Sequence, residues 1–292
     1  MDQLFDTGAQ ERPGGRRPPS ADAPLAARMR PGGLDEVVGQ SHLLGEGMAL
    51  RSAIEHGRPH SMVLYGPPGS GKTTLARIVA TSSGAAFEEL SAVEAGRAEV
   101  RGVIERAGHR REARGERTVL FVDEIHRFNK AQQDVLLPAV EEGLVTLIGA
   151  TTENPYFEVN SALLSRTQVY ELHELTSADV EALVRRALER GECGTTQVDD
   201  EAIAFLAARA GGDARTALAA LELACATAGA EDEGRVTLEL AEDALQRRAV
   251  RFDRSGDQHY DTISAWIKAT RDSIRVAVVS DIGRRCLSLI HI

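Results

Sequence analysis

Short apolar runs alternate with amphipathic segments between residues 62 and 172. The runs are rich in β-branched and aliphatic residues and predict buried strands at Met62–Tyr65, Ala86–Leu90, Thr118–Val122, Val145–Ala150 and Val169–Leu172. Apolar residues at helical spacing predict helices at Met48–Glu55, Lys72–Ser82, Val93–Ala107, Lys130–Glu141 and Ser161–Ser165. Strands separated by helices of this size form parallel sheets with helices on both faces. The pattern therefore predicts an α/β fold.

The pattern changes after Glu174, where we predict no strand. Apolar residues recur at helical spacing in the segments Ser177–Arg190, Asp199–Ala210, Ala214–Ala228 and Leu238–Arg247. Ser177 and Asp199 are typical N-caps, and Gly191 is a typical helix stop. Residues before about 28 are rich in Pro, Gly and Arg and lack periodicity. We therefore predict a disordered arm at 1–27, the α/β domain at 28–173, a small all-helical domain at 174–250 and a C-terminal segment at 251–292.

Composition limits the classes to which the protein can belong. With 292 residues, 42% of them hydrophobic and 4% aromatic, the chain can form one or two domains whose cores consist mainly of Ala, Leu, Val and Ile. No apolar run approaches the length of a membrane span, and no secretory signal is evident. Cys193, Cys225 and Cys286 are far apart, which is typical of reduced thiols in a cytosol. We therefore expect a cytoplasmic protein without a membrane partner.

A glycine-rich loop separates the strand Met62–Tyr65 from the next helix. It consists of Gly66, Pro67, Pro68, Gly69, Ser70, Gly71, Lys72 and Thr73, with Thr74 following. The glycines let backbone N–H groups point at phosphate oxygens, and the helix start adds its unpaired N–H groups. Lys72 can reach the outer phosphates, and Thr73 can bind Mg²⁺ through its hydroxyl. A turn that binds nothing is the alternative, but the strand, loop and helix context favours a phosphate site.

Two acidic residues, Asp123 and Glu124, follow the strand Thr118–Val122. Beside a phosphate loop, Asp123 would bind Mg²⁺, and Glu124 would orient and deprotonate the attacking water. Two solvated acids at a strand end are the alternative. His126 follows them without a His or Cys at ligand spacing, so we predict a packing role for it and no zinc site.

Three further polar residues carry weaker signals. Asn154 follows the strand Val145–Ala150, where an amide could fix the water or the γ-phosphate, although Asn after a strand is usually a turn residue. Arg166 follows a short predicted helix, and Arg215 opens a helix of the second domain. Considered alone, each arginine would be an ordinary surface residue.

Taken in order, these motifs resemble those of an AAA+ ATPase, a P-loop NTPase whose parallel sheet is followed by a small helical lid. A narrower similarity to the replication-associated recombination protein A family, which is related to the Werner-interacting ATPase, is carried by the segments Ala27–Pro31, Asp123–Lys130, Asn160–Arg166 and Gly256–Asp261. The resemblance extends from about Leu25 to Thr270.

The resemblance implies ATP and Mg²⁺ as cofactors and assigns roles to individual residues. Asn154 takes the sensor-1 position, and Arg166 takes the position of the arginine finger, which reaches the ATP of a neighbouring subunit. Arg215 takes the sensor-2 position of the lid, and Val38 and Gly39 lie where the family wraps the adenine. Because an arginine supplied in trans contributes about 10³–10⁵ in rate, hydrolysis is expected to depend on assembly.

The family resemblance also implies a function. It indicates a DNA-dependent, clamp-loader-like ATPase of DNA replication, recombination and repair at stalled forks, associated with the nucleoid. Implied partners are DNA junctions or forks, further copies of the chain (tetramers in the family) and a sliding clamp or single-strand-binding protein, with Gln3-Leu4-Phe5 resembling a clamp-docking peptide. Two alternatives are a nucleotide-gated scaffold that recruits replication proteins and a branch-migration helicase. Between Asp123 and Asn154 there is little room for the extra hairpin of branch-migration motors.

A net charge of -10 argues against DNA binding through global charge, so DNA contact requires a local basic surface. The candidate surface is an arginine cluster in the Val93–Ala107 helix and the loop after it, in the region where related clamp loaders meet the DNA backbone. It contains Arg97, Arg101, Arg106, Arg110, Arg111, Arg114 and Arg117. A solvated helix face is an equal alternative, because several glutamates interrupt the cluster.

The chain departs from the family after about Thr270, where the family continues into a long helical domain that assembles tetramers. We predict a helix at Thr262–Thr270, while the final residues Leu287–Ile292 look like translated non-native sequence. The expectation is a truncated start of the oligomerisation region with a poorly packed tail. Nucleotide binding should survive this loss, and efficient hydrolysis should not.

Overall fold

The computed structural model describes residue 20 and residues 22–230 and 234–253. The chain divides into two compact units after Glu242, so the sheet and most of the helical region belong to the first unit. No helix among the described residues has the length and apolar character required to cross a membrane. The predicted helix at Thr262–Thr270, the C-terminal tail and the Gln3-Leu4-Phe5 peptide lie outside the described residues.

Five parallel strands form one sheet in the order β2-β3-β4-β1-β5. Their bounds are β1 (Met62–Tyr65), β2 (Ala86–Ser91), β3 (Thr118–Asp123), β4 (Val145–Thr151) and β5 (Gln168–Glu171). The predicted α/β fold is confirmed, and each strand end lies within one residue of its prediction. Because the strands are parallel and β3, β4 and β1 are neighbours, the segments that follow these three strands leave the same edge of the sheet.

The helices of the α/β domain precede the first strand or connect the strands to one another. They are α2 (Ser41–Leu44), α3 (Ala49–Glu55), α4 (Lys72–Ser83), α5 (Arg97–Arg114), α6 (Lys130–Glu141), α7 (Pro155–Glu158) and α8 (Ser161–Leu164), with 3-10 turns at Leu34–Glu36 and Ile125–Arg127. The predicted start of α5 at Val93 is wrong. The carboxylate of Glu99 accepts a hydrogen bond from the Gly96 N–H at 2.9 Å, and this cap places the helix start after Gly96.

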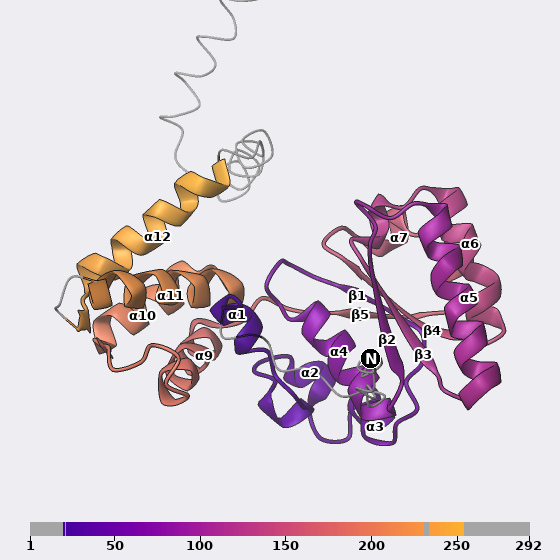
Figure 1. Ribbon diagram of the computed structural model, residues 1–292, viewed down its shortest axis with the longest axis horizontal. Coiled ribbons are helices and arrows are strands. Elements are labelled where there is room, and N and C mark those ends of the chain that lie inside the picture. Colours follow the sequence, from indigo (N-terminus) through magenta and orange to yellow (C-terminus); the bar gives the residue numbers. More distant parts are fainter. Residues whose placement is uncertain (1–19, 21, 231–233, 254–292) are drawn as a thin grey trace, which may run out of the picture. The chain divides into compact units, whose positions relative to one another are not determined.

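Apolar side chains cover both faces of the sheet. Val119 and Phe121 of β3 belong to one buried cluster, which includes residues of α3 and α4. Leu120 and Val122 belong to a second buried cluster, with residues of α5 and α6. Figure 1 shows these two pairs of helices on opposite sides of the strands. Successive strand residues face opposite sides, so a continuous apolar run is the pattern that a sheet covered on both faces requires.

The helical domain contains four helices and one short strand pair in its described part. The helices are α9 (Ser177–Glu189), α10 (Asp200–Arg209), α11 (Ala214–Ala230) and α12 (Leu238–Asp253), and β6 (Gln197–Val198) pairs in parallel with β7 (Arg235–Val236). The expectation of no strand in this region is wrong, because two-residue strands are too short to show a periodicity.

The predicted cap Ser177 of α9 is also wrong. Thr176 is the N-cap, and its hydroxyl accepts from the Asp179 N–H at 3.1 Å.

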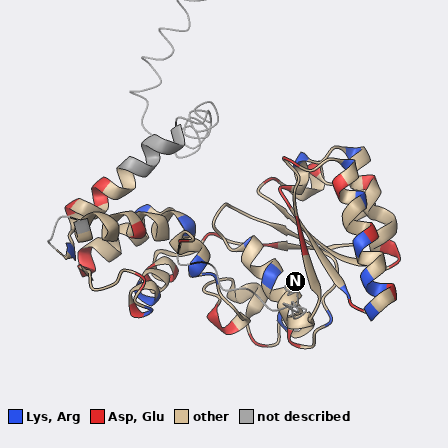
Figure 2. Ribbon diagram, viewed as in Figure 1, with Lys and Arg blue, Asp and Glu red and all other residues tan. Residues whose placement is uncertain are grey.

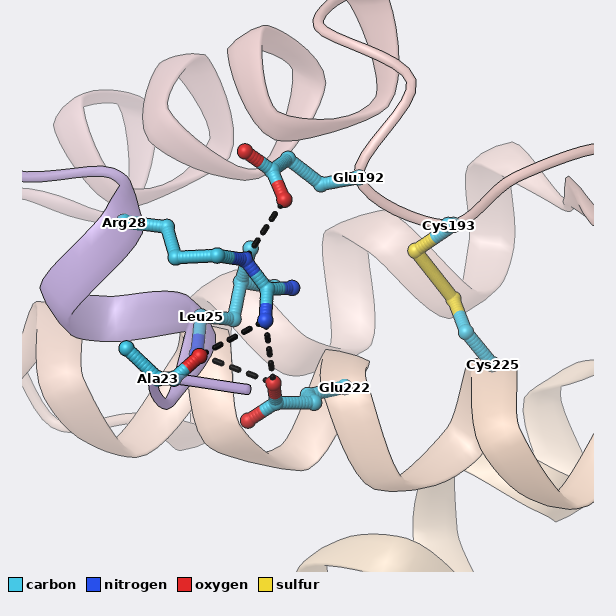
Figure 3. A network of polar contacts seen from close by, with 7 residues as sticks. All are labelled: Ala23, Leu25, Arg28, Glu192, Cys193, Glu222 and Cys225. Atoms are coloured by element: carbon cyan, nitrogen blue, oxygen red, sulfur yellow. Dashed lines mark hydrogen bonds and ion pairs between the residues drawn. A yellow bond between two sulfur atoms is a disulfide. The ribbon is translucent and has the colours of Figure 1, made fainter. Parts of the chain in front are cut away.

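The predicted disordered arm ends earlier than residue 27, because α1 (Leu25–Arg28) packs against α11. Figure 3 shows Arg28 between two carboxylates, with Nε 2.7 Å from Glu192 Oε2 and Nη1 3.3 Å from Glu222 Oε1. The Leu25 N–H also donates to Glu222 Oε1 at 2.9 Å, and the Leu25 side chain is buried. A hydrophobic anchor and charge-assisted hydrogen bonds therefore hold this segment on the helical domain.

The expectation of three reduced cysteines is wrong for two of them. Cys193 and Cys225 form a disulfide with their Cα atoms 5.7 Å apart (Figure 3). Cys193 follows α9 and Cys225 lies on α11, and these two helices pack against each other. Packing thus brings together two residues that are 32 positions apart in the sequence. Cys286 lies outside the described residues.

Candidate nucleotide-binding site

The phosphate loop lies between the carboxyl end of β1 and the start of α4, as predicted. Gly66, Gly69 and Gly71 have positive φ angles of 152°, 71° and 100°. A Cβ on Gly66 would overlap the Leu172 carbonyl, and a Cβ on Gly69 would overlap the Asp213 carboxylate. Glycine is therefore required for the backbone conformation at all three positions, and for space at two of them. The loop and the helix start together supply N–H groups suited to phosphate oxygens.

Lys72 is the first residue of α4 and is only 9% exposed. Its ammonium donates to the carbonyl oxygens of Gly66 at 2.7 Å and Pro67 at 2.8 Å. Burial lowers the pKa of Lys72, and the carboxylates of Glu124 and Asp123 oppose this shift. A buried ammonium within the electrostatic field of two carboxylates is suited to a polyanionic ligand accompanied by a divalent cation.

The other loop residues occupy the positions that the motif requires. Ser70 is buried, and its hydroxyl donates to the Pro67 carbonyl at 2.8 Å, which stabilises the bend of the loop. Pro68 is exposed at the tip. Thr73 and Thr74 lie partly exposed in the first turn of α4. The hydroxyl of Thr73 is thus available to a metal ion at the helix start.

Asp123 ends β3, and Glu124 follows it with a left-handed backbone, φ 53°. Both side chains are partly exposed. Because β3, β4 and β1 are neighbours, the acidic pair leaves the sheet at the same edge as the phosphate loop. A non-glycine residue with a left-handed backbone is strained, and such strain persists where the surrounding structure holds the residue in place.

Two residues that the sequence analysis did not assign to the site contact Glu124 directly or indirectly. His126 Nδ1 lies 3.3 Å from Glu124 Oε2 and 2.9 Å from the hydroxyl of Thr151, which is fully buried at the end of β4. The Thr151 hydroxyl donates to the Glu153 carbonyl, so an Nδ1–H tautomer of His126 can donate to both Thr151 and Glu124. The predicted packing role of His126 is thus incomplete, because its ring also restrains the Glu124 carboxylate.

Asn154 lies outside this network. Its side-chain oxygen accepts from the Tyr156 N–H at 3.0 Å and caps α7, and the residue is exposed. The polar side chain that lies next to His126 is that of Thr151, three positions earlier. A hydroxyl in the last position of β4, at the edge of the sheet where the phosphate loop begins, was the signal that could have identified Thr151 from the sequence.

The two arginines from the resemblance lie in different surroundings. Arg166 Nη2 pairs with Glu141 Oε1 at 2.6 Å, and both side chains are at the surface. Arg215 lies at the start of α11, where its N–H donates to Asp213 Oδ1 at 2.8 Å. The charge of Arg215 contributes to the lowered pKa of Lys72, so the structure brings this arginine into electrostatic range of the phosphate loop.

Val38 and Gly39 precede α2 in a partly buried segment. Gly39 has a positive φ of 72°, and a Cβ there would overlap a methyl group of Leu175. The segment assigned to the adenine therefore packs against the connection between β5 and α9.

The arginine cluster along α5 is smaller than the sequence indicates. Figure 2 shows basic and acidic residues interspersed along this helix. Arg106 and Arg110 both pair with Glu88. Burial raises the pKa of the Glu88 carboxyl, but hydrogen bonds from the two arginines outweigh it and lower the pKa overall. The side chains of Arg111 and Arg117 donate to backbone carbonyls.

Among the described residues, the exposed arginines of this cluster that have neither an acidic nor a carbonyl partner are Arg97, Arg101 and Arg114. An anionic ligand could contact these three side chains without first breaking an ion pair.

Two family models match the chain. Residues 62–175 match the ATPase family associated with various cellular activities (AAA), and residues 192–271 match an AAA C-terminal domain. Among solved structures, the Holliday junction branch migration motor RuvB of Thermotoga maritima is similar with a TM-score of 0.63 and 28% identity, over 75% of this chain and 72% of that chain.

Among curated proteins, the replication-associated recombination protein A of Escherichia coli is 51% identical over 256 residues, which are 86% of this chain and 57% of that protein. An uncharacterized AAA domain-containing protein of Mycobacterium tuberculosis is 50% identical over 93% of this chain and 60% of its own length. The ATPase WRNIP1 of Dictyostelium discoideum is 41% identical over 86% of this chain and 31% of its own length. The chain thus spans about three fifths, or less, of these relatives.

The matches cover the sheet, the phosphate loop and the helical domain in one continuous order. The chain therefore belongs to the AAA+ ATPases of the replication-associated recombination protein A family.

Proposed function

We propose that this chain is the ATP-hydrolysing part of a clamp-loader-like machine that acts on DNA during replication, recombination and repair at stalled forks. The observation that carries the proposal is the convergence on Lys72 of charges from two separate parts of the chain: Asp123 and Glu124 at the end of β3, and Arg215 at the start of α11. The names of the relatives support the recombination and replication setting.

Each residue of the site has a chemical task in this proposal. The loop N–H groups and Lys72 bind the phosphates, and Thr73 and Asp123 provide oxygen ligands for Mg²⁺. Mg²⁺, when bound, neutralises charge on the phosphate oxygens. Glu124 orients the attacking water and accepts its proton, and His126 restrains the Glu124 carboxylate through the contact at 3.3 Å.

Hydrolysis depends on assembly in this proposal, because Arg166 serves the ATP of a neighbouring copy. Within its own subunit Arg166 is paired with Glu141, so association must exchange that carboxylate for a phosphate of the neighbour. The proposed assembly is a homo-oligomer that encloses DNA, with Arg97, Arg101 and Arg114 on the DNA side. Such contacts are independent of sequence and sensitive to salt.

The test is ATP hydrolysis measured against protein concentration, with and without a DNA fork that carries a single-stranded gap. A rate per subunit that rises with concentration and DNA supports the proposal, and a rate that DNA never changes contradicts DNA dependence. Arg97→Gln and Arg101→Gln should each lower the stimulation by DNA. Arg185→Gln is the matched control, because this exposed arginine of α9 pairs with two carboxylates of the helical domain.

A branch-migration helicase is the second candidate, and the structural similarity to RuvB favours it. The connection from β3 to β4 consists of the turn Ile125–Arg127 and α6, without a hairpin, and for this reason we rank translocation second. A nucleotide-gated scaffold is the third candidate. A scaffold that carries Glu124→Gln would keep DNA and partner binding and would lose little of its biochemical output. A remodeller with the same substitution would give trapped complexes and no strand opening.

A further inference from the structure

Gln40 combines a strained backbone with a buried side chain. Its φ of 57° is left-handed, and among the described residues Glu124 alone shares this feature outside glycine. Only 7% of Gln40 is exposed. A non-glycine residue keeps a left-handed backbone where its contacts hold it in that conformation, so the contacts of Gln40 indicate its role.

The side-chain amide of Gln40 joins two segments that are distant in the sequence. Its Nε2 donates to the His173 carbonyl at 2.8 Å, and its Oε1 accepts from the His173 N–H at 3.0 Å. The same Nε2 lies 3.4 Å from the carbonyl oxygen of Ser70 in the phosphate loop. One amide thus satisfies both polar backbone groups of His173 and also contacts the loop.

These contacts lie where two paths of the chain separate. Strands β1 and β5 run side by side, and the Leu172 N–H donates to the Tyr65 carbonyl at 2.7 Å. After β1 the chain enters the phosphate loop, and after β5 it enters residues 172–175, which lead to α9 and are named here the hinge segment. Gly66 packs directly against the Leu172 carbonyl. Gln40 therefore bridges the middle of the loop, at Ser70, and the start of the path to the helical domain, at His173.

We propose that Gln40 is a positioning residue that couples the phosphate loop to the hinge segment, and through it to Arg215. A shift of Ser70 when phosphates bind would be transmitted through the Gln40 amide to His173. The helical domain would then move with the hinge segment and bring Arg215 toward the phosphates. This inference rests on the proposed ATPase function and adds the link between binding and the movement of the helical domain.

Two variants separate the coupling from the fold. Gln40→Asn keeps an amide and a residue that tolerates the left-handed backbone, but it is one methylene too short to reach both partners. Gln40→Gly relieves the backbone strain and removes the amide altogether. His42→Ala is the matched control. Its ring stacks on His173 at 3.9 Å and contacts the Glu171 carbonyl, so it touches the same path without reaching the phosphate loop.

The measurements are ATP binding, steady-state hydrolysis and hydrogen exchange of residues 69–71 and 213–216 with and without ATP and Mg²⁺. In the wild-type chain, ATP should protect both segments. In Gln40→Asn and Gln40→Gly, residues 69–71 should stay protected while 213–216 lose protection, and kcat should fall about tenfold with a smaller change in KM. His42→Ala should resemble the wild type.

Wild-type protection and turnover in both Gln40 variants would overturn the coupling, as would an equal effect of His42→Ala. If one variant does not fold, the other decides. A wild-type chain that binds no ATP would instead overturn the proposed function itself, so the two failures are distinguishable.

Discussion

Different interactions stabilise the interior of the α/β domain and the interior of the helical domain. The strands carry large, fully buried side chains such as Phe121, Leu147 and Ile148. The buried face of α11 consists largely of alanines, including Ala217, Ala220 and Ala224, which bury less apolar area per residue. The helical domain adds a disulfide and the Arg28 ion pairs. The phosphate loop thus adjoins a densely packed sheet, whereas Arg215 lies on a domain that a few specific links stabilise.

The largest expected effect tests the sheet side of this comparison. Glu124→Gln should lower turnover by about 10²–10⁴, because the amide cannot accept the proton of water. ATP affinity should change little, since the phosphate loop is intact. Single-turnover hydrolysis and equilibrium ATP binding provide the measurement. Glu153→Gln, an exposed neighbour at the end of β4, is the control, and equal losses in both variants would argue against a specific role for Glu124.

The next effect tests the fastening of the helical domain. Reduction of the Cys193–Cys225 disulfide should lower the free energy of unfolding by about 3–4 kcal/mol, since the bridge closes a loop of 32 residues. Urea unfolding with and without a thiol reductant measures this loss. Cys225→Ser should already show it and should not respond to reductant. A response of Cys225→Ser equal to that of the wild type would show that the reductant acts elsewhere.

A smaller effect tests how the sheet positions its carboxylate. His126→Leu should lower turnover by about 10–100-fold, because Glu124 loses its restraint and a misplaced base is a poor one. His126→Asn should recover part of the activity, since its amide can reproduce the Nδ1 hydrogen bond. The readout is kcat, with ATP affinity and thermal stability as references. Loss of stability with unchanged kcat would assign His126 to packing alone.

The smallest effect compares equivalent helix caps in the two domains. Asn129 caps α6 and Thr176 caps α9, each with a reciprocal bond from the third helical residue. Replacement of either by alanine should cost about 1 kcal/mol, and urea midpoints measure both losses. If Thr176→Ala cost several times more than Asn129→Ala, the helical domain would depend on its caps to an unexpected degree.

The local pattern of the sequence determined the elements and the phosphate loop. Strand and helix positions follow from periodicities of two and 3.6 residues, which act over a few neighbours. The same is true of Gly66 to Thr73, because the conformational freedom of glycine and the start of a helix are local properties. Among the long helices, the bounds of α5 and the end of α12 differ most from the prediction, because α5 runs from Arg97 to Arg114 and α12 extends to Asp253. The Glu99 side chain caps α5 at Gly96 and overrides the apolar pattern that precedes it.

The tertiary structure alone decided which distant residues meet. The pairing of Cys193 with Cys225, of Arg106 with Glu88, and of Gln40 with His173 joins residues on different elements. None of these contacts leaves a periodic signal, because each depends on how whole helices and strands pack. The sequence by itself thus predicted the chemistry of the candidate phosphate site. Only the tertiary structure placed Thr151 and His126 beside Glu124, and it alone placed Gln40 between the loop and the hinge segment. Such contacts form only where packing brings two distant backbone segments within reach of one side chain.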